Sequence, residues 1–225
     1  MKATALLAQT LHDALPQTQC TRCGFPDCHA YAQAIAQGEA GINQCPPGGQ
    51  QGVLRLATIT GKPPLPLDAS HGTEGPRRLA RIDEAWCIGC TLCMKACPVD
   101  CIVGGPKAMH TVIEALCTGC DLCLPVCPVD CIDMIDASGG RTGWDAWSPA
   151  QAQEARSRYE FRSFRLARDQ AERDERLAHK ARRAPHGDPV SSPADVGTAE
   201  DRAPAQEVKR SVIEAAMALA RARRS

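Results

Sequence analysis

Aromatic residues are scarce in this chain of 225 residues, which has three Phe, three Trp and two Tyr. Alanine is its most frequent apolar residue, so we do not expect one large hydrophobic core. Runs of about 18 consecutive apolar residues are also absent, so no segment is expected to span a bilayer. No glycine-rich nucleotide fingerprint and no nucleophile or acid–base pair stands out. We therefore expect no catalytic residues.

The chain carries no net charge, since 26 Lys and Arg residues balance 26 Asp and Glu residues. Its two parts differ, because residues 1–140 hold 9 basic against 13 acidic residues and residues 141–225 hold 17 against 13. All cysteines lie in the acidic part. This distribution does not favour nucleic-acid binding, and it favours a positively charged docking surface on a partner.

Cysteine is abundant, with 14 residues. That density is high for an intracellular protein and low for a small disulfide scaffold. Gln9, His12 and Asp13 interrupt the apolar start of the chain and no cleavage pattern follows, so we do not expect a secretory signal. The cysteines are therefore expected in a reducing cytoplasm, where thiolates bind metal.

Composition divides the chain into six segments, and we expect an α+β protein. The segments are a small helical four-cysteine domain (1–60), a proline-rich linker (61–80), a ten-cysteine domain (81–137), a glycine-rich turn with a charged helix (138–184), a disordered linker (185–206) and a basic amphipathic helix (207–225).

Helices in the first domain follow from the leucine spacing and from proline. Leucines at helical spacing predict a helix over residues 2–15, which Pro16 ends. A second helix is expected from Asp27 to about Gln37. The glycines that follow predict a turn; they are Gly48, Gly49 and Gly52.

The charged helix that begins near residue 150 is rich in Ala, Arg, Glu and Asp. Pairs such as Glu154 with Arg158 are typical of a solvated helix. Its aromatic residues nevertheless indicate that its start packs on the ten-cysteine domain; they are Tyr159, Phe161 and Phe164. The basic helix at the end of the chain is expected to dock on a partner subunit.

An internal repeat occupies residues 82–135, and we expect a pseudo-two-fold fold from it. Five cysteines recur with a shift of 30 residues. They are Cys87, Cys90, Cys93, Cys97 and Cys101 in the first copy, and Cys117, Cys120, Cys123, Cys127 and Cys131 in the second.

Each copy contains the pattern C-x2-C-x2-C-x3-C-P. Three thiolates at this spacing can wrap one corner of an iron–sulfur cluster, while the fourth points away from it. A zinc site would need two CxxC pairs with a longer spacer, so the close triplets fit zinc poorly. The pattern therefore predicts iron–sulfur clusters.

Residues 81–137 resemble the bacterial dicluster ferredoxins. The resemblance implies two [4Fe-4S] clusters in a βαβ-type domain, one held by Cys87, Cys90, Cys93 and Cys127 and the other by Cys97, Cys117, Cys120 and Cys123. A domain of this size cannot fold on hydrophobic burial alone, so the clusters would stabilise the fold. Cys101 and Cys131 are then left over, and we expect them to be packing residues.

The four cysteines of the first domain have a different spacing: Cys20, Cys23, Cys28 and Cys45. Spacing alone leaves a structural zinc site open beside an iron–sulfur cluster. Cys28 lies in the first turn of its expected helix, where the helix dipole favours a thiolate whichever metal binds.

The stretch "LPQTQCTRCGFPDCHAYAQAIAQGEAGINQCPPGG", followed by a dicluster ferredoxin, resembles the B subunit of the Rnf (also called Rsx) electron-transport complex. The resemblance covers about residues 3–137 and implies that the first four cysteines bind a third [4Fe-4S] cluster. In that family, the B subunit receives electrons at the cytoplasmic face of a membrane complex that couples ferredoxin and NAD redox chemistry to ion movement. The family's N-terminal membrane-spanning helix has no counterpart before this short first helix, so we expect no membrane anchor here.

The resulting expectation is an electron-transfer protein with three [4Fe-4S] clusters, cytoplasmic or peripheral on the cytoplasmic face of the inner membrane. Its expected partners are redox proteins, such as a ferredoxin, a flavoprotein or other subunits of an electron-transport complex, and any membrane association would be peripheral or through them. Two alternatives stay open: a redox-responsive binding or assembly module, and a stand-alone ferredoxin for another redox enzyme.

Three further residues receive expectations. His29 and His110 are expected to have surface or packing roles, because each cluster already has four cysteines. Trp86, just before Cys87, is expected to shield a cluster from solvent.

Overall fold

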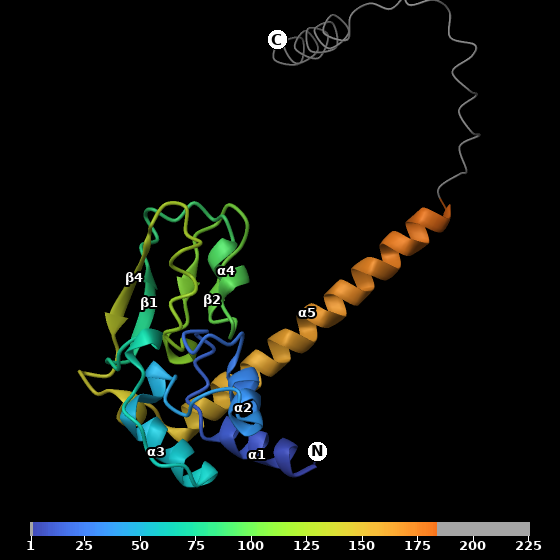
Figure 1. Cartoon of the computed structure of the whole chain (residues 1–225). Helices are drawn as coiled ribbons and strands as arrows, with labels where there is room; N and C mark the ends of the chain where they lie inside the picture. Colours follow the sequence, from blue (N-terminus) through green and yellow to red (C-terminus); the bar gives the residue numbers. More distant parts are fainter. Residues whose placement is uncertain (1, 184–225) are drawn as a thin grey trace, which may run out of the picture. The chain divides into compact units, whose positions relative to one another are not determined.

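The computed structural model describes residues 2–183 (Figure 1). The segments expected at 185–206 and 207–225 lie outside the described residues. The described residues up to Arg173 form one compact unit, and the contacts reported below lie within it. No helix of the described part is long and apolar enough to cross a membrane.

Three helices form the N-terminal part: α1 (Lys2–Asp13), α2 (Cys28–Gln37) and α3 (Gly49–Thr60). The predicted helix over residues 2–15 is confirmed as α1, apart from its last turn. Asp27 is the N-cap of α2, since its carboxylate accepts a hydrogen bond from the backbone N–H of Ala30 at 2.7 Å. Leucine, alanine and isoleucine side chains of the three helices pack around the fully buried Tyr31.

The turn predicted at Gly48, Gly49 and Gly52 is present at Gly48, and the prediction is wrong for Gly49 and Gly52. A 3-10 turn, η1 (Pro46–Gly48), leads directly into α3, so Gly49 and Gly52 are helical. Val53, Leu56 and Ala57 of α3 are buried in the core, and this packing outweighs the poor helix propensity of glycine.

The proline-rich segment that follows contains a second 3-10 turn, η2 (Ala69–His71). It contacts the N-terminal part along its length. The N–H of Asp68 donates to the carbonyl of Asn43 at 2.9 Å, and the N–H of Leu67 donates to the Oε1 atom of Gln50 at 3.2 Å.

The cysteine repeat forms two short antiparallel sheets. Strand β1 (Arg78–Ile82) pairs with β4 (Ile132–Asp136), and β2 (Ile102–Val103) pairs with β3 (Thr111–Val112). By the repeat shift of 30 residues, β1 is equivalent to β3 and β2 is equivalent to β4. Each sheet therefore joins one strand from each copy. The pairing confirms a mixed helix and sheet fold in which the two copies of the repeat interlock.

Backbone geometry also repeats between the copies. Gly89 and Gly119 have φ values of 67° and 68°, and Asp100 and Asp130 both have φ of 49°. A Cβ atom on Gly119 would lie 2.2 Å from the carbonyl oxygen of Arg78, so only glycine fits there. The same loop conformation is therefore built twice.

Helix α4 (Leu92–Ala96) breaks this symmetry, because the second copy has only turns at the equivalent residues. Pro125 stands where the first copy has Lys95. Proline has no N–H group for a helical hydrogen bond and its ring clashes with the preceding turn. This substitution accounts for the missing helix.

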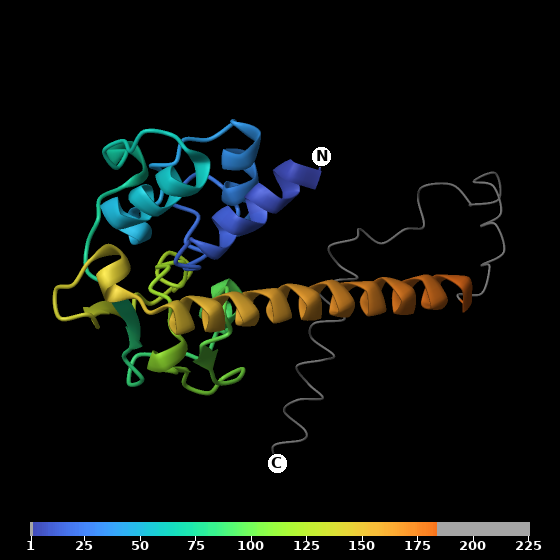
Figure 2. The same ribbon diagram turned by 90° about the horizontal axis from the view of Figure 1, so that it is seen from below.

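The charged helix is α5 (Pro149–Arg183), which follows the short turns η3 (Glu114–Leu116) and η4 (Gly143–Ala146). Its start lies between helices α1–α3 and the cysteine repeat (Figure 2). Ala152 and Ala155 are buried there and Tyr159 is half-buried. The expectation that Phe161 and Phe164 also pack there is wrong, because their side chains are 64% and 63% exposed.

Candidate metal centres

The ten cysteines of the repeat line two separate cavities, each mostly apolar. One cavity is lined by Cys97, Cys101, Cys117, Cys120 and Cys123, together with Ala80, Val99 and Ile102. The other is lined by Cys87, Cys90, Cys93, Cys127 and Cys131, with Ile82, Val129 and Ile132. We call them the Cys97 cavity and the Cys127 cavity.

In each cavity, three cysteines come from one copy of the repeat and the fourth cysteine of the pattern comes from the other copy. Cys97 leaves its own triplet and joins that of Cys117, and Cys127 crosses in the opposite direction. This grouping has the arrangement that the crossing pattern of two-cluster ferredoxins requires. Which of these sulfur atoms bind iron stays a prediction.

Backbone N–H groups point at cysteine sulfurs in equivalent places of both copies. The N–H of Ala80 lies 3.5 Å from Cys117 Sγ, and the N–H of His110 lies 3.4 Å from Cys87 Sγ. In addition, the N–H of Cys101 lies 3.3 Å from Cys97 Sγ. Such N–H donors stabilise thiolate charge, and they shift the potential of a cluster bound by those thiolates.

The fifth cysteine of each copy lies next to the crossing cysteine. Cys101 Sγ is 3.4 Å from Cys97 Sγ, and Cys131 Sγ is 3.6 Å from Cys127 Sγ. Hydrogen bonding from the Cys101 thiol lowers the pKa of Cys97 to about 6, while the pKa of Cys101 itself is raised, chiefly by its bonds to Cys117 and Cys97. This arrangement favours a thiolate at Cys97 and a neutral thiol at Cys101.

His110 is a residue whose role the sequence did not reveal. Its side chain is only 1% exposed, and its Nδ1 atom lies 3.4 Å from Cys93 Sγ. The equivalent residue in the other copy is Ala80, which has no such polar group. The difference could have been found from the sequence, because the shift of 30 residues aligns His110 with Ala80. The backbone N–H groups of both residues point at cysteine sulfurs.

Trp86 does not shield a cavity as expected, because its side chain is 70% exposed. His29, the other histidine with an expected surface or packing role, makes an edge contact with the ring of His12. The two ring centroids are 5.1 Å apart. That contact agrees with a packing role.

The four N-terminal cysteines come from the segment between α1 and α3 in the sequence, and they lie close enough for their charges to interact. Burial raises the pKa of the Cys45 thiol well above its usual range, and the charges of Cys28, Cys20 and Cys23 add to this effect. Burial also raises the pKa of the Cys28 thiol, and the charges of Cys20 and Cys23 act in the same direction. Four thiolates would therefore need a cation among them.

The loop that precedes α2 is held in an unusual conformation. Gln17, Gln19 and Thr21 have φ values of 59°, 54° and 58°, which L-residues rarely adopt. The side chain of Gln19 accepts a hydrogen bond from the N–H of Cys28 at 2.9 Å. Backbone strain of this kind is typical of binding sites that hold their ligands in place.

The N-terminal cysteine loop contacts the second copy of the repeat directly. Arg22, between Cys20 and Cys23, forms an ion pair with Asp121, which follows Cys120. The hydroxyl of Thr118 donates to the carbonyl of Thr18 at 3.0 Å. The N-terminal centre therefore lies beside the loop that lines the Cys97 cavity.

The residues present fit iron–sulfur clusters. Four cysteine sulfurs facing one apolar cavity are the donor set of a [4Fe-4S] cluster, and each repeat cavity supplies this set with one cysteine to spare. The N-terminal set also supplies four sulfurs. In the part of the chain that the structure describes, no group of three or more His, Cys, Asp or Glu side chains has an arrangement that could hold a single metal ion.

Two family profiles match the chain. One, described as "4Fe-4S dicluster domain", matches residues 80–134, and another, described as "Putative Fe-S cluster", matches residues 15–47. The first covers both repeat cavities and the second covers the N-terminal cysteines.

Curated relatives share one name, which describes the B subunit of an ion-translocating oxidoreductase complex. The relative from Thiobacillus denitrificans is 61% identical over 98 residues, which are 44% of this chain and 52% of that protein. The relative from Azoarcus sp. is 62% identical over 98 residues, 44% of this chain and 54% of that protein. The relative from Stutzerimonas stutzeri is 54% identical over 138 residues, 61% of this chain and 71% of that protein. The chain thus matches about half the length of the first two and over two thirds of the third.

Proposed function

Because the chain belongs to the family of B subunits of ion-translocating oxidoreductase complexes, we propose that it carries electrons through three [4Fe-4S] clusters within such a complex. An iron–sulfur electron-transfer role follows from the family and from the dicluster domain. The number of clusters, their ligands and the place in the complex are the proposed parts.

The proposed ligands are the cysteines that each site brings together. They are Cys87, Cys90, Cys93 and Cys127 in the Cys127 cavity, Cys97, Cys117, Cys120 and Cys123 in the Cys97 cavity, and Cys20, Cys23, Cys28 and Cys45 in the N-terminal part. When bound, a [4Fe-4S] cluster accepts and releases one electron at a time. The chain's own residues hold the sulfurs, exclude water and direct N–H groups at them.

The observation that carries the proposal is the exchange of Cys97 and Cys127 between the two copies. A fold in which each site depends on both copies makes metal binding and folding one event. A disulfide scaffold would instead bring pairs of cysteines together, whereas here five sulfurs surround each cavity.

The order of the three sites suggests a route for electrons. The Cys97 cavity contacts both neighbours, since it shares the repeat with the Cys127 cavity and its Cys120 loop touches the Arg22 loop. We propose that electrons pass between the Cys127 site and the N-terminal site through the Cys97 site, in whichever direction the partners' potentials drive them.

Membership of a complex also implies partners. We propose that other redox proteins or subunits dock beside these sites, and that any association with a membrane is peripheral or through them. The relatives' shared name describes a component of a multi-subunit complex, which supports partners of this kind.

The test asks whether the chain is reduced and reoxidised by a redox protein, or whether its clusters only change its affinity for a partner. Anaerobically purified chain is mixed with a reduced ferredoxin or a flavoprotein reductase, and its visible absorbance is followed. Rapid and reversible bleaching over many cycles supports electron transfer. A change in partner affinity on cluster loss, without turnover, would instead favour the redox-responsive binding module.

A further inference from the structure

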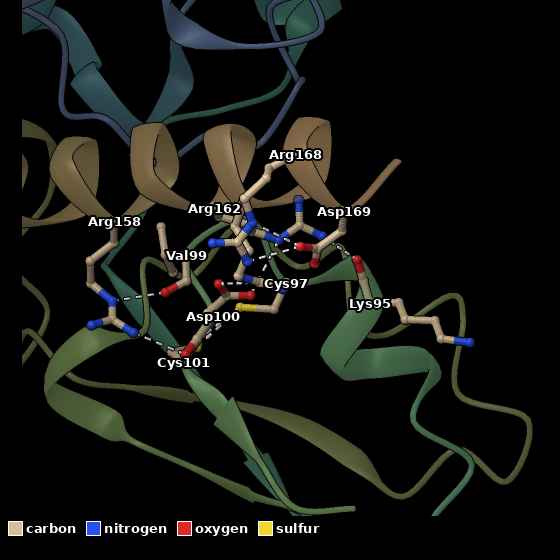
Figure 3. Close-up of polar contacts among 10 residues, drawn as sticks. Lys95, Cys97, Val99, Asp100, Cys101, Arg158, Arg162, Arg168 and Asp169 are labelled. Atoms are coloured by element: carbon tan, nitrogen blue, oxygen red, sulfur yellow. Dashed lines mark hydrogen bonds and ion pairs between the residues drawn. The ribbon is translucent and has the colours of Figure 1, made fainter. Parts of the chain in front are cut away.

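Three arginines of α5 hold the loop between Cys97 and Cys101 (Figure 3). Arg165 Nη2 lies 2.7 Å from Asp100 Oδ2, and Arg162 Nε lies 3.4 Å from Asp100 Oδ1. Arg162 also donates to the carbonyl of Lys95 in α4. Two of the three positive charges therefore meet one carboxylate at this loop.

Arg158 differs from the other two because it binds the backbone. Its Nε atom donates to the carbonyl of Val99 at 2.8 Å and its Nη2 atom donates to the carbonyl of Asp100 at 3.0 Å. The solvated pair expected between Glu154 and Arg158 is not among the ion pairs of residues 2–183. The two carbonyls that Arg158 binds lie on either side of Asp100, whose backbone is left-handed.

The peptide bond between Asp100 and Cys101 links Arg158 to sulfur. Its carbonyl accepts from Arg158, and its N–H lies 3.3 Å from Cys97 Sγ. A donor on the carbonyl side of a peptide polarises its N–H group and strengthens the bond which that group donates. Arg158 is therefore linked to the crossing cysteine through a single peptide group.

The second copy of the repeat lacks this support. Asp130 has the same φ as Asp100, but no arginine of residues 2–183 contacts its loop through a hydrogen bond or ion pair. The Cys127 cavity has the His110 side chain at Cys93 instead. One helix thus makes two nearly equivalent sites chemically different.

We propose that Arg158 is a positioning residue that raises the reduction potential of the centre in the Cys97 cavity relative to the centre in the Cys127 cavity. The inference rests on the proposed function, since it takes Cys97 as a ligand. Reduction adds one negative charge to a centre, and a nearby guanidinium and a strengthened N–H to sulfur bond stabilise that charge. The Cys97 centre becomes the preferred electron acceptor of the pair.

The test uses the full chain with its clusters, and follows each centre by EPR during a redox titration. Arg158→Met keeps an unbranched, flexible side chain and removes the charge and the donors. The ratio of reduced to oxidised Cys97 centre at a fixed potential should fall by a factor of about three or more, from the loss of one charge in partly buried protein. The Cys127 centre should change little.

Arg168→Met is the matched control. It also removes one positive charge from α5, but Arg168 pairs with Asp169 and Glu172 on the same helix and contacts no cysteine loop. Cys97→Ser identifies the signal of the Cys97 centre, because only that centre should change its EPR spectrum. Arg158→Lys keeps the charge with a single point of contact and should give a smaller shift.

Iron content separates this inference from the proposed function. Wild-type chain without clusters at the repeat would contradict the proposed function itself. Arg158→Met with full iron and unchanged potentials, or with equal shifts at both centres or in the control, would overturn only the role of Arg158. If Arg158→Met loses iron, Arg158→Gln decides, because it removes the charge and keeps an amide donor; an unshifted potential in that variant would reduce Arg158 to a structural residue.

Discussion

The hydroxyl of Tyr159 on α5 donates a hydrogen bond to Asp27 at 3.0 Å, and Asp27 in turn caps the helix that begins with Cys28. Helix α5 therefore supports the N-terminal site from one side and the Cys97 loop from the other. Arg156, one turn earlier, adds an ion pair with Asp13 of α1. One helix therefore makes contacts near both sites.

Tyr159→Phe should lower the free energy of unfolding by about 1 kcal/mol, because it removes one hydrogen bond to a charged group and leaves the ring in place. Chemical denaturation of the cluster-loaded chain measures this. Phe161→Leu serves as control, since the Phe161 ring is exposed, and it should change stability little. Equal effects of the two variants would show that the bond to Asp27 contributes nothing.

Much of this arrangement could be predicted from the sequence, because local rules govern it. The leucine spacing predicted α1, a second helix was expected from Asp27 to about Gln37, and both helices are present. The repeat of 30 residues predicted two equivalent halves, and their strands pair across the copies. Family membership could be recognised from the N-terminal cysteine motif together with the repeat.

The rest depends on contacts between residues distant in sequence. Helix α3 has two glycines among its first four residues and forms because its apolar face is buried. The charge pattern of α5 indicated pairs within the helix, but Arg158 and Arg162 bind a loop about 60 residues away. His110 was expected to have only a surface or packing role, because no local sequence pattern shows that its side chain faces Cys93.

The spare cysteines should be dispensable for metal binding. Cys101→Ala with Cys131→Ala should keep all iron, whereas Cys97→Ala should damage a centre formed mainly by the second copy. Iron per chain, measured after anaerobic purification, distinguishes the two variants. Loss of four iron atoms per chain from the double variant, on the count of one cubane, would show that the fifth cysteines are ligands.

The contact between the N-terminal loop and the second copy should stabilise the unit. Asp121 pairs with both Arg22 and Arg78, so Asp121→Asn should cost about 1 kcal/mol of unfolding free energy, discounted for partial exposure. Asparagine tolerates the positive φ of 64° found there, which isolates the effect of charge.

Asp133→Asn provides the comparison for that variant. It breaks the Arg81–Asp133 pair, whose side chains are both largely exposed and join two strands of one sheet. Exposed pairs contribute little, so the unfolding midpoint should hardly move. A similar loss in both variants would mean that the Arg22 contact has no special role.

Acidification should destabilise the chain through His12. Burial lowers the pKa of His12 from 6.5 to about 4, and the charges of Arg156 and His29 act in the same direction. The unfolded chain therefore binds more protons at this residue between pH 6.5 and 4, so stability is full above that window and falls as the pH drops through it.

Between pH 7.5 and 5.5 the expected loss from His12 is about 1 kcal/mol of unfolding free energy. Denaturation curves at both pH values measure it in the wild type and in His12→Gln. The variant should lose this part of the pH dependence. An identical pH dependence in both proteins would exclude His12 as the titrating group.

The central claim is that three sets of four cysteines hold three [4Fe-4S] clusters, and metal analysis tests it most directly. Iron, acid-labile sulfide and zinc are measured per chain after anaerobic purification. The account predicts about twelve iron and about twelve sulfide with no zinc, at four of each per cubane. About eight iron and eight sulfide with one zinc ion would contradict it, and would assign the N-terminal cysteines to a structural zinc site.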